Sequence, residues 1–462
     1  AIEDPAGYTV EFERDALHRI TRVKDGKGTL ERIVYDAKDR VVEREDALGQ
    51  KSFAAYDENG NLIETIDEAG NKTVYTYDVY RLTAVEDALN HISRTEYDAA
   101  GNVTREIDAN GGVTEYAYDA LGRVVKVTDP DGHVSRYTYD DAGNVLTFTD
   151  GTGSVTRYTY DKNNQLLTVT DATGAVTQYS YDASGRKIKE TNPLGNSTWY
   201  DYDEAGRLIA VTNALGGVTR YAYDANGRLI EQTLPDGSVW KTKYDSRGLE
   251  AGTIDPLGRE TFVTRDDRGR VTAFKDAAGA VTRYEYDELD RNTKIVNALG
   301  HETIYEYDPL GNVAKIIDAN QGETAFQYDA LGRLTGVTDA LGGVTSYSYD
   351  AAGNLVEKKD ALGRATTYRY NKRNLVVESV NPLGEKTVTA YDAAGKVTTV
   401  TAPDLTTTTY SYDPAHRLKQ IEYGDGQKVS FTYDLAGRRI EMVDSSGLTR
   451  YTYDALDRLT EV

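Results

Sequence analysis

The chain has 462 residues, a formal net charge of −22 at pH 7 and a sequence pI near 4.8. A chain this acidic is repelled by nucleic-acid phosphates and by anionic membrane surfaces, and it has no apolar run long enough to span a bilayer. We therefore expect neither a nucleic-acid partner nor membrane insertion. Because the chain has no cysteine, disulfides, thiolate catalysis and cysteine-ligated zinc are excluded.

One motif repeats from end to end. The dipeptide Tyr-Asp recurs every 21 residues, for example at Tyr118-Asp119 and Tyr139-Asp140, and two of the steps are 20 residues long. When the degenerate dipeptides Arg14-Asp15 and Arg265-Asp266 are included, there are about 22 copies. We expect residues 1–462 to form a single array of these repeats, with no separate catalytic domain.

A clear copy, residues 132–153, contains two strand signals and two turn signals. Val134–Tyr139 is β-branched and aromatic with a period of two, which predicts a strand. Asp140–Gly143 then predicts a tight turn, here named the YD turn, because Asp bonds the backbone ahead of it and Gly accepts positive φ. A short second strand, Val145–Thr149, leads into another turn of the same kind, Asp150–Gly153, here named the return turn.

Strands joined by turns this short must pair antiparallel, since a parallel pair needs a long crossover. Helices are not expected, because Gly, Asn-Gly and Pro interrupt the chain at strand spacing. About 44 strands result, and strand twist must accumulate over such a ribbon. The predicted fold class is all-β: tandem β-hairpin repeats form a long antiparallel sheet that spirals into a hollow shell or barrel.

Side-chain alternation assigns roles within the repeat. Tyr137 and Tyr139 share one face of their strand, and we expect such tyrosines to stack on neighbouring hairpins. The Arg that follows the YD-turn Gly is expected to pair with the Asp across the turn and to mark the register. The residues that represent this pattern are Tyr118, Asp119, Gly122, Arg123, Tyr137, Tyr139, Asp140, Gly143, Tyr221, Tyr223, Asp224, Gly227 and Arg228.

No residue pattern predicts catalysis, a cofactor or a metal. The five histidines fall at two turn positions in distant copies, where surface decoration is expected, and no pair has metal-ligand spacing. The carboxylates recur at every turn and so lack the two different environments that acid–base catalysis needs. Weak Ca²⁺ binding by the Asp-rich turns stays open.

Breaks in the pattern are the places where a special site could lie. Arg265 replaces a Tyr, Asn371 replaces an Asp, and Tyr80 fills a turn, while Trp199 and Trp240 are the only tryptophans. At these positions we expect contacts with another part of a parent protein rather than a ligand pocket.

The intact motif Tyr221-Ala222-Tyr223-Asp224-Ala225-Asn226-Gly227-Arg228-Leu229 resembles the YD repeat of the Rhs family, which includes C components of insecticidal toxin complexes, bacterial cell-wall proteins and teneurins. The resemblance implies a ribbon that spirals into a hollow cocoon, and in bacterial members the cocoon encloses a C-terminal toxin. This chain has no Arg-Tyr-Tyr-Asp-Pro core signature, so the resemblance does not assign autoproteolysis or toxicity to it.

The resemblance therefore implies a structural shell segment that encapsulates a C-terminal toxin or other cargo in the parent protein. Its expected partners are the cargo polypeptide and other parts of the parent protein, with self-association left open. Secretion or display at a bacterial cell surface is implied as well. The alternative is an extracellular adhesion or fibre-forming repeat protein, since repetitive sheets can also add end to end through exposed edges. An enzyme, such as a glycosidase, is the least favoured alternative.

Overall fold

A computed structural model describes all residues, 1–462, and consists of strands and tight turns with no helix. There are 46 strands in a 25-stranded, a 19-stranded and a two-stranded sheet. Neighbouring strands in sequence pair antiparallel, as in β14 with β15 (Val134–Tyr139 and Val145–Thr149). The prediction of an all-β chain of tandem hairpins in long antiparallel sheets is confirmed.

The strands of the 25-stranded sheet are β1 (Ile2–Glu3), β2 (Thr9–Arg14), β3 (Ile20–Lys24), β4 (Thr29–Tyr35), β5 (Val41–Asp46), β6 (Lys51–Tyr56), β7 (Leu62–Ile66), β8 (Lys72–Asp78), β9 (Arg81–Glu86), β10 (Ile92–Tyr97), β11 (Val103–Ile107), β12 (Val113–Tyr118), β13 (Val124–Thr128), β14, β15, β16 (Val155–Tyr160), β17 (Leu166–Thr170), β18 (Val176–Tyr181), β19 (Lys187–Thr191), β20 (Ser197–Tyr202), β21 (Leu208–Thr212), β22 (Val218–Tyr223), β23 (Leu229–Thr233), β24 (Val239–Tyr244) and β25 (Glu250–Ile254).

The strands of the 19-stranded sheet are β26 (Phe262–Arg265), β27 (Val271–Lys275), β28 (Val281–Tyr286), β29 (Asn292–Val296), β30 (Glu302–Tyr307), β31 (Val313–Ile317), β32 (Glu323–Tyr328), β33 (Leu334–Thr338), β34 (Val344–Tyr349), β35 (Leu355–Lys359), β36 (Ala365–Tyr370), β37 (Val376–Val380), β38 (Lys386–Tyr391), β39 (Val397–Thr401), β40 (Thr407–Tyr412), β41 (Leu418–Glu422), β42 (Lys428–Tyr433), β43 (Arg439–Asp444) and β44 (Gly447–Arg450). The last two strands, β45 (Thr452–Tyr453) and β46 (Leu459–Glu461), pair with each other.

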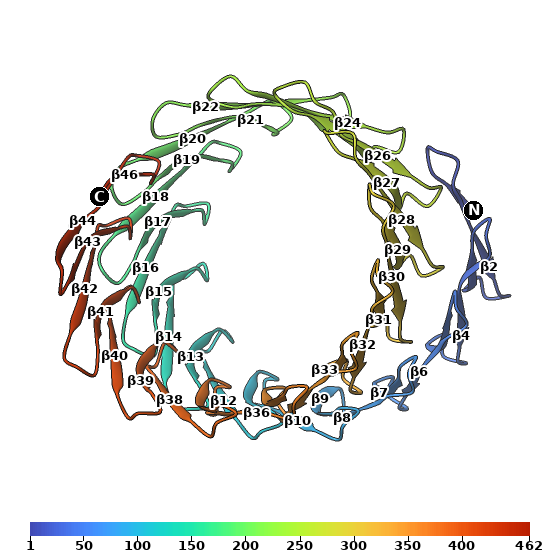
Figure 1. Ribbon diagram of the computed structural model, residues 1–462, viewed down its shortest axis with the longest axis horizontal. Coiled ribbons are helices and arrows are strands. Elements are labelled where there is room, and N and C mark those ends of the chain that lie inside the picture. Colours follow the sequence, from blue (N-terminus) through green and yellow to red (C-terminus); the bar gives the residue numbers. More distant parts are fainter. The chain divides into compact units, whose positions relative to one another are not determined.

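Each hairpin is built as the repeat predicts, with one irregularity. In β14 and β15 Tyr137 faces Phe148 and Thr138 faces Thr147, but the register shifts by one residue at Tyr139. The shift is a β-bulge beside the YD turn, and bulges of this kind increase local twist. Successive hairpins then follow one another along the chain (Figure 1), with β15 pairing onward to β16.

The two 20-residue steps are shortened turns. Between β8 and β9 only Val79 and Tyr80 remain outside the strands, and Asp78 pairs with Arg81. Val79 has φ of 56°, an uncommon conformation for a β-branched residue, which a two-residue hairpin loop requires. The turn between β43 and β44 is equally short, since Asp444 pairs with Gly447.

The two large sheets separate between β25 and β26, next to the degenerate dipeptide Arg265-Asp266. A single bridge joins Ile254 to Glu260, and the backbone N–H of Thr253 donates to the Thr261 hydroxyl at 2.9 Å instead of to a carbonyl. Gly252 permits this approach, because a Cβ there would lie 2.0 Å from the Thr261 carbonyl oxygen.

The sheets are not covered by a second layer. The exposed surface of the chain is 26109 Å² at 51.0 kDa, whereas a compact globule of this mass would expose about 17,000 Å². Ala175, at 5% exposure, is the only hydrophobic side chain that is buried, and most strand residues are half-buried. The wall is therefore one sheet thick, and its stability rests on neighbour contacts within the sheet.

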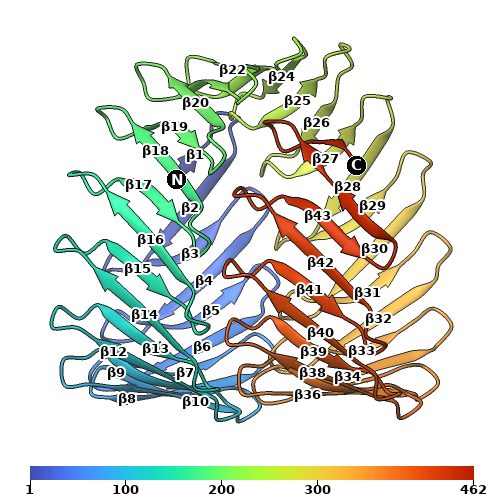
Figure 2. The same cartoon turned by 90° about the vertical axis from the view of Figure 1, so that its left-hand side faces the viewer.

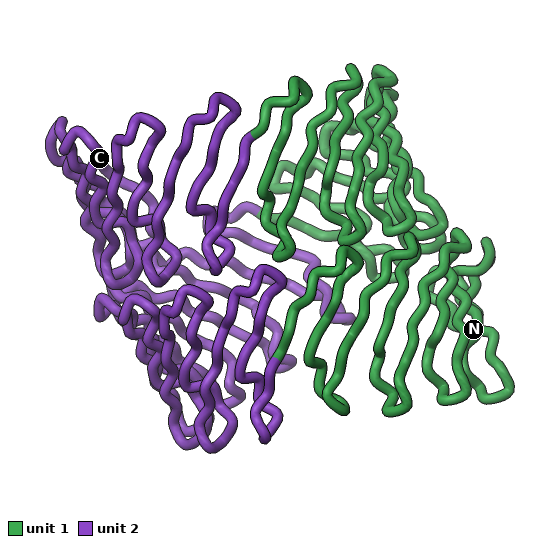
Figure 3. The backbone as a smooth tube through the Cα atoms, turned by 90° about the horizontal axis from the view of Figure 1, so that it is seen from below, with its two compact units in different colours: residues 1–95, 239–365 green, residues 96–238, 366–462 purple.

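The chain divides into two compact units, each made of two segments (Figure 3). Unit 1 comprises residues 1–95 and 239–365, and unit 2 comprises residues 96–238 and 366–462. Within each unit the earlier segment forms a first row of hairpins and the later segment a second row. In unit 2, strands β14–β18 of the first row lie beside β39–β43 of the second (Figure 2). No helix in either unit could cross a bilayer.

Candidate functional site

The YD turn is held by its Asp. In the copy at Asp119, Oδ1 accepts hydrogen bonds from the backbone N–H groups of Leu121 and Arg123 at 2.9 and 3.0 Å, and Oδ2 accepts from Arg123 Nε at 2.7 Å. Gly122 has φ of 77° and donates its N–H to the Asp119 carbonyl at 3.0 Å. One carboxylate therefore satisfies three donors, which fixes the turn geometry.

The same Arg joins its repeat to the next one. Arg123 donates to the carbonyl oxygen of Asp140 at 3.0 Å, and its guanidinium carbon lies 4.7 Å from the centre of the Tyr139 ring. Tyr139 in turn donates its hydroxyl to the carbonyl of Val124 at 2.7 Å. Adjacent hairpins are thus linked by a cation–π contact and by hydrogen bonds in both directions.

The other residues singled out from the sequence occupy the same arrangement. Arg228 Nε donates to Asp224 Oδ2 at 2.6 Å, and the Tyr223 hydroxyl donates to the carbonyl of Leu208 at 2.8 Å. Gly227 has φ of 80°. The residues therefore serve the turn and the link between hairpins.

The motif varies at the Arg position, while the Tyr hydrogen bond is kept. Tyr118, for example, donates to the carbonyl of Val103 at 2.7 Å. At Asp140 the Arg is replaced by Asn144, whose Nδ2 donates to Asp140 Oδ2 at 2.9 Å, while Gly143 keeps a φ of 93°. The Asn144 amide makes the hydrogen bond to the Asp140 carboxylate that Arg makes elsewhere, but it has no positive charge with which to contact the ring of the next motif Tyr.

The Tyr-Asp tyrosines pack on the neighbouring hairpin as expected, but against Arg side chains and not against one another, because equivalent strands of adjacent hairpins are about 9–10 Å apart, beyond ring-contact distance. A second strand lies between them, so Tyr137 contacts Phe148 with 5.0 Å between the ring centres. In the same position Tyr221 faces Gln232. The tyrosines of the Tyr-Asp dipeptide contact Arg side chains instead.

The degenerate repeat at Arg265 preserves the link without a Tyr. Arg265 donates to the carbonyl of Glu250 at 3.2 Å, the residue 15 positions earlier, which is the spacing at which the motif Tyr donates elsewhere. It also donates to the carbonyl of Gly269 at 3.0 Å. The substitution is therefore accommodated within the wall.

Hydrogen bonding lowers the pKa values of the turn carboxyls. The side chain and then the backbone N–H of Arg40 lower the pKa of Asp36 to about 2. At Asp119 the backbone N–H of Arg123 is the largest cause, and it keeps the pKa below its usual value although burial raises it.

The pKa values of tyrosines in the sheet are raised. The hydrogen bond that Tyr116 donates to the Glu106 carboxylate, together with burial, raises the pKa of Tyr116 to about 12. Burial is also the main cause that raises the pKa of Tyr139.

We expect stability to fall at both ends of the pH range. The stability that the Asp carboxylates contribute is present above the ordinary pKa of 3.8 and is lost as pH falls through their folded pKa values, which for Asp36 is about 2. The Tyr contribution is present below the ordinary pKa of 10.0 and is lost as pH rises through the raised values, up to about 12 for Tyr116. Thermal melts followed by circular dichroism measure the loss of stability in acid and in alkali, and tyrosinate absorbance follows tyrosine ionisation on the alkaline side. Alkaline unfolding that runs ahead of tyrosine ionisation would contradict this account.

Tyr139→Phe should reduce the free energy of unfolding by about 0.5–1.5 kcal/mol, because the hydroxyl bond to Val124 is lost from a half-buried position. Tyr137→Phe in the same strand is the matched control, since its contact is through the ring to Phe148. It should change stability by less than about 0.5 kcal/mol. Urea titrations compare the two variants, and equal losses would show that the hydroxyl bond is not the cause.

Rows within a unit meet along a seam, where YD turns of the second row contact return turns of the first. In unit 1 Arg268 Nε donates to Asp25 Oδ2 at 2.7 Å, and Tyr8 donates its hydroxyl to the same oxygen at 3.0 Å. The side chains of Arg268 and Asp25 are 7% and 0% exposed. Burial raises the pKa of Asp25, but bonds from the Lys27 backbone N–H, Arg268 and Tyr8 outweigh burial and hold the pKa low.

The seam of unit 2 contains the Asn that interrupts the Tyr-Asp pattern. Asn371 Nδ2 donates to Asp131 Oδ2 at 2.9 Å, and Arg373 Nε donates to the same oxygen at 2.8 Å. Arg373 Nε also lies 3.5 Å from Asp129 Oδ2. An Asp at position 371 would place a second carboxylate against Asp131, which explains the exception.

His416 also belongs to this seam, which corrects the expectation that the turn histidines are only surface decoration. Its Nε2 lies 2.5 Å from Asp150 Oδ2, 266 residues away in sequence. Next to it, a Cβ on Gly151 would lie 3.1 Å from Ala393 Cβ, so the two rows approach closely there.

The sequence singled out Asn371, but sequence reasoning missed the Arg residues of the seams, although a signal was present. Arg247, Arg268 and Arg373 all occupy the position before the last residue of the YD turn, where the other full-length copies have Ala, Leu, Asn, Ser or, once, Lys. Arg247 lies 3.8 Å from Asp4, so all three contact the first row. Trp199 and Trp240 are partly exposed, and their contact with another part of a parent protein stays a prediction.

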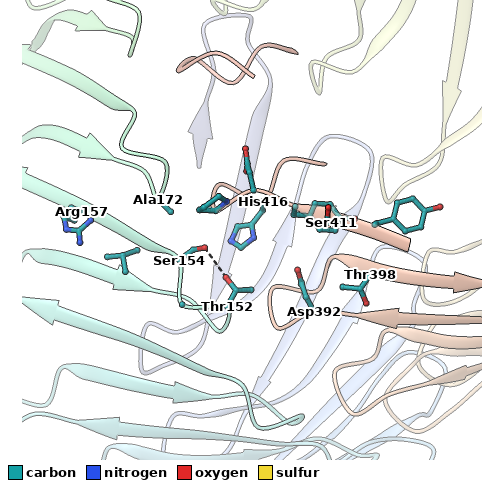
Figure 4. A pocket seen from close by; sticks show the side chains of 14 residues that line it. Thr152, Ser154, Arg157, Ala172, Asp392, Thr398, Ser411 and His416 are labelled. Carbon is teal, nitrogen blue, oxygen red and sulfur yellow. Dashed lines mark hydrogen bonds between the residues drawn. The ribbon is translucent and has the colours of Figure 1, made fainter. Parts of the chain in front are cut away.

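A hollow of about 720 Å³ lies at the seam of unit 2 (Figure 4). Thr152 and Ser154 from the first row and Asp392 and His416 from the second line it, with a 3.1 Å hydrogen bond from Thr152 to Ser154. The Asp392 carboxylate already accepts the backbone N–H of Ala394 at 2.9 Å. No cluster of three or more His, Cys, Asp or Glu side chains is arranged to hold a metal ion.

Two family models match the sequence. The model for the Teneurin YD-shell matches residues 80–246. The model for the RHS Repeat matches residues 56–92, 265–302, 328–361, 349–386, 391–428, 416–449 and 433–462. No curated protein sequence matches the chain significantly.

Solved structures share the fold. The crystal structure of TcdB2-TccC3-Cdc42 matches with a TM-score of 0.62 and 16% identity over 98% of this chain and 34% of that chain. TcdB2-TccC3 matches with a TM-score of 0.59 and 17% identity over 98% and 32%. TcdB2-TccC3 without the hypervariable C-terminal region gives 0.50 and 16% over 98% and 33%. This chain spans about a third of the length of these structures.

Proposed function

Because this chain belongs to the Rhs and YD-repeat family, we propose that it is a wall segment of a shell that encloses a polypeptide cargo in a longer parent protein. The single observation that carries the proposal is a wall one sheet thick, with an exposed surface of 26109 Å². A meander of this length that has no second layer is expected to wind, since strand twist accumulates, and its hairpins are held by their neighbours in the sheet and by the seams between rows.

The proposed partners are the cargo and other parts of the parent protein. One of the similar structures is described as TcdB2-TccC3 without its hypervariable C-terminal region, and a variable region in such a relative supports a cargo that varies while the wall stays constant. The proposed location is outside the cell or at a bacterial cell surface. A structural role without catalysis is supported by the turn carboxylates, whose oxygens accept backbone and Arg hydrogen bonds, as at Asp119 and Asp224.

Two measurements test the enclosure. Small-angle X-ray scattering of the purified chain should give a distance distribution shifted to longer distances than that of a solid particle of equal mass. A flexible Gly/Ser-rich reporter with tryptic sites, fused after Val462, should be digested at least about tenfold more slowly than the free reporter, because a wall restricts access.

The matched control carries the same reporter on a chain with Arg268→Ala and Arg373→Ala, which removes one ionic contact from each seam, and there protection should be reduced. A solid scattering profile, or digestion as fast as that of the free reporter, would remove the shell proposal. Extended filaments in images of the unmodified chain would favour the adhesion or fibre alternative.

A further inference from the structure

Positive charge gathers on one face of the first row of unit 2. Side chains directly opposite each other on antiparallel strands share a face, as do residues two apart on one strand. Lys126 lies opposite Arg136, and Arg136 lies opposite Thr149. Thr147, two residues before Thr149, lies opposite Arg157. Three cations on strands β13, β14 and β16 therefore share one face of the sheet.

Two further cations continue this face. The same register runs through β17 and β18 to Lys189, which lies opposite Trp199. From Trp199 it runs through β21 to Arg220. Between β13 and β22 the face carries one acidic side chain, Asp201. The five cations are named the basic stripe, and their strands follow one another along the row (Figure 2): Lys126, Arg136, Arg157, Lys189 and Arg220.

At equivalent positions elsewhere, cations on this face are neutralised within the sheet. In unit 1 Lys315 lies 3.6 Å from Glu306 and 3.5 Å from Glu323, which belong to the two adjacent strands. Lys294 likewise has a carboxylate on each neighbouring strand. The repeat therefore readily places Glu beside a cation on this face, and the stripe departs from that arrangement.

The cations of the stripe are left without such partners. Arg136, Arg157 and Arg220 are exposed and form no ion pair within the chain. Lys189 contacts a ring instead of a carboxylate, with its Nζ 5.5 Å from the centre of Trp199. Five cations beside one carboxylate, on a chain of net charge −22, form a local positive patch that is available to a negatively charged partner.

The position of the stripe suits a narrow, extended ligand. It crosses the strands near their middle, and the nine spacings between β13 and β22 at about 4.8 Å each give about 43 Å, the length of about 13 residues of extended polypeptide. The turns at the ends of these strands carry carboxylates such as Asp140 and Asp150, so a wide polyanion would meet negative charge on either side. Between the cations, hydroxyls such as those of Thr149 and Thr170 can bond a peptide backbone.

We propose that the basic stripe binds an extended acidic segment of a partner polypeptide, whose carboxylates pair with the Arg side chains. Charge complementarity favours this occupant, since Arg and carboxylate form strong, directed hydrogen bonds. A single-stranded nucleic acid fits less well, because such sites stack successive bases on several aromatic rings, whereas the stripe has one ring, Trp199, which Lys189 already contacts. Binding at the stripe does not depend on whether the wall encloses cargo.

Fluorescence anisotropy of a labelled peptide of about 14 residues, with Glu at every second position, tests the proposal against the intact chain at up to about 200 μM. The peptide should bind at about 0.05 M salt and at least about tenfold more weakly at about 0.5 M salt, because screening removes the attraction. The emission of Trp199 in a Trp240→Phe background should change on binding, since Trp199 lies among the cations.

The triple variant Arg136→Gln, Arg157→Gln, Arg220→Gln should bind the peptide at least about fivefold more weakly at low salt. Circular dichroism should show an unchanged fold, because these three side chains are exposed.

The matched control is Lys294→Gln, Lys315→Gln, Lys359→Gln in unit 1, where each Lys pairs with a Glu. Both variants lose three cations from −22 and so have a net charge of −25. The control should bind the peptide within about twofold of the parent chain, since its cations are already neutralised.

Four results would overturn the proposal. The first is the absence of peptide binding at low salt. The second is equal weakening in both triple variants, which would indicate a general effect of charge, or peptide binding that leaves Trp199 emission unchanged. The third is tighter binding of an oligothymidylate of about 14 nucleotides, which would make the occupant a nucleic acid. The fourth is self-association of the parent chain in sedimentation that the Arg variant abolishes, which would make the occupant a second copy.

Discussion

Arg268→Ala should lower the free energy of unfolding of unit 1 by about 3 kcal/mol, at the lower end for a broken buried ion pair because the seam borders solvent. The loss arises because Asp25, whose side chain is 0% exposed, keeps its charge but loses its cation. The Tyr8 hydroxyl and two backbone N–H groups compensate only in part. Urea titration followed by Trp240 fluorescence in a Trp199→Phe background measures this, because Trp240 belongs to unit 1 and Trp199 to unit 2.

Arg259→Ala is the matched control. Arg259 makes the same kind of Nε-to-carboxylate bond, to Asp255 at 2.6 Å, but its side chain is 60% exposed and it contacts no other row. Arg259→Ala should therefore lower the free energy of unfolding by no more than about 1 kcal/mol. Equal losses in the two variants would show that the seam pair does not hold the rows together.

A double substitution at Asp25 and Arg268 separates the effect of charge balance from the effect of packing at this point of the seam. Asp25→Leu with Arg268→Met removes both charges and keeps apolar volume, so it should recover much of the stability that Arg268→Ala loses. If the double variant is less stable than the single one, packing at this point of the seam, and not charge balance, dominates.

The local structure could be predicted from the sequence because one 21-residue repeat contains the signals for two strands and two turns and recurs along the chain. The ranges Val134–Tyr139 and Val145–Thr149 are strands β14 and β15 with the same bounds, and about 44 expected strands compare with 46. The alternation of side chains along a strand and the chemistry of turn residues act over a few residues, so each copy of the repeat specifies its own strands and turns. The irregular repeat at Arg265 follows the same logic, since Arg265 reaches the acceptor that a Tyr would use.

The seam could not be predicted in the same way. Arg268 and Asp25 are 243 residues apart, and their meeting depends on how many hairpins the accumulated twist needs before one row reaches another. That number is set by small angles summed over many strands, which no local pattern specifies. The ring partner of each Tyr-Asp tyrosine is also hard to predict, because a second strand lies between equivalent Tyr positions and the ring of Tyr139 therefore meets Arg123 instead of another Tyr.

The exception at Asn371 gives the second large prediction. Asp fills this motif position in every other copy, so a consensus argument would expect Asn371→Asp to stabilise the chain. The seam predicts the reverse, a loss of about 1–3 kcal/mol at neutral pH, because the donor to Asp131 at 2.9 Å becomes a second carboxylate. Arg373 is already shared between Asp129 and Asp131 and can offset only part of the repulsion. Urea titration by Trp199 fluorescence in a Trp240→Phe background measures unit 2.

The same chemical change away from any seam is the control. Asn297 accepts the backbone N–H groups of Leu299 and His301 in an exposed return turn of unit 1, and an Asp there would accept the same bonds. Asn297→Asp should therefore be neutral or slightly stabilising when measured through Trp240. The penalty at Asn371 should shrink in acid, since protonation of one carboxyl removes the repulsion, whereas Asn297→Asp should lose any benefit there. If Asn371→Asp is as stable as the parent chain at neutral pH, the two rows of unit 2 do not meet through Asp131, and the exception reflects only drift in a tolerant turn.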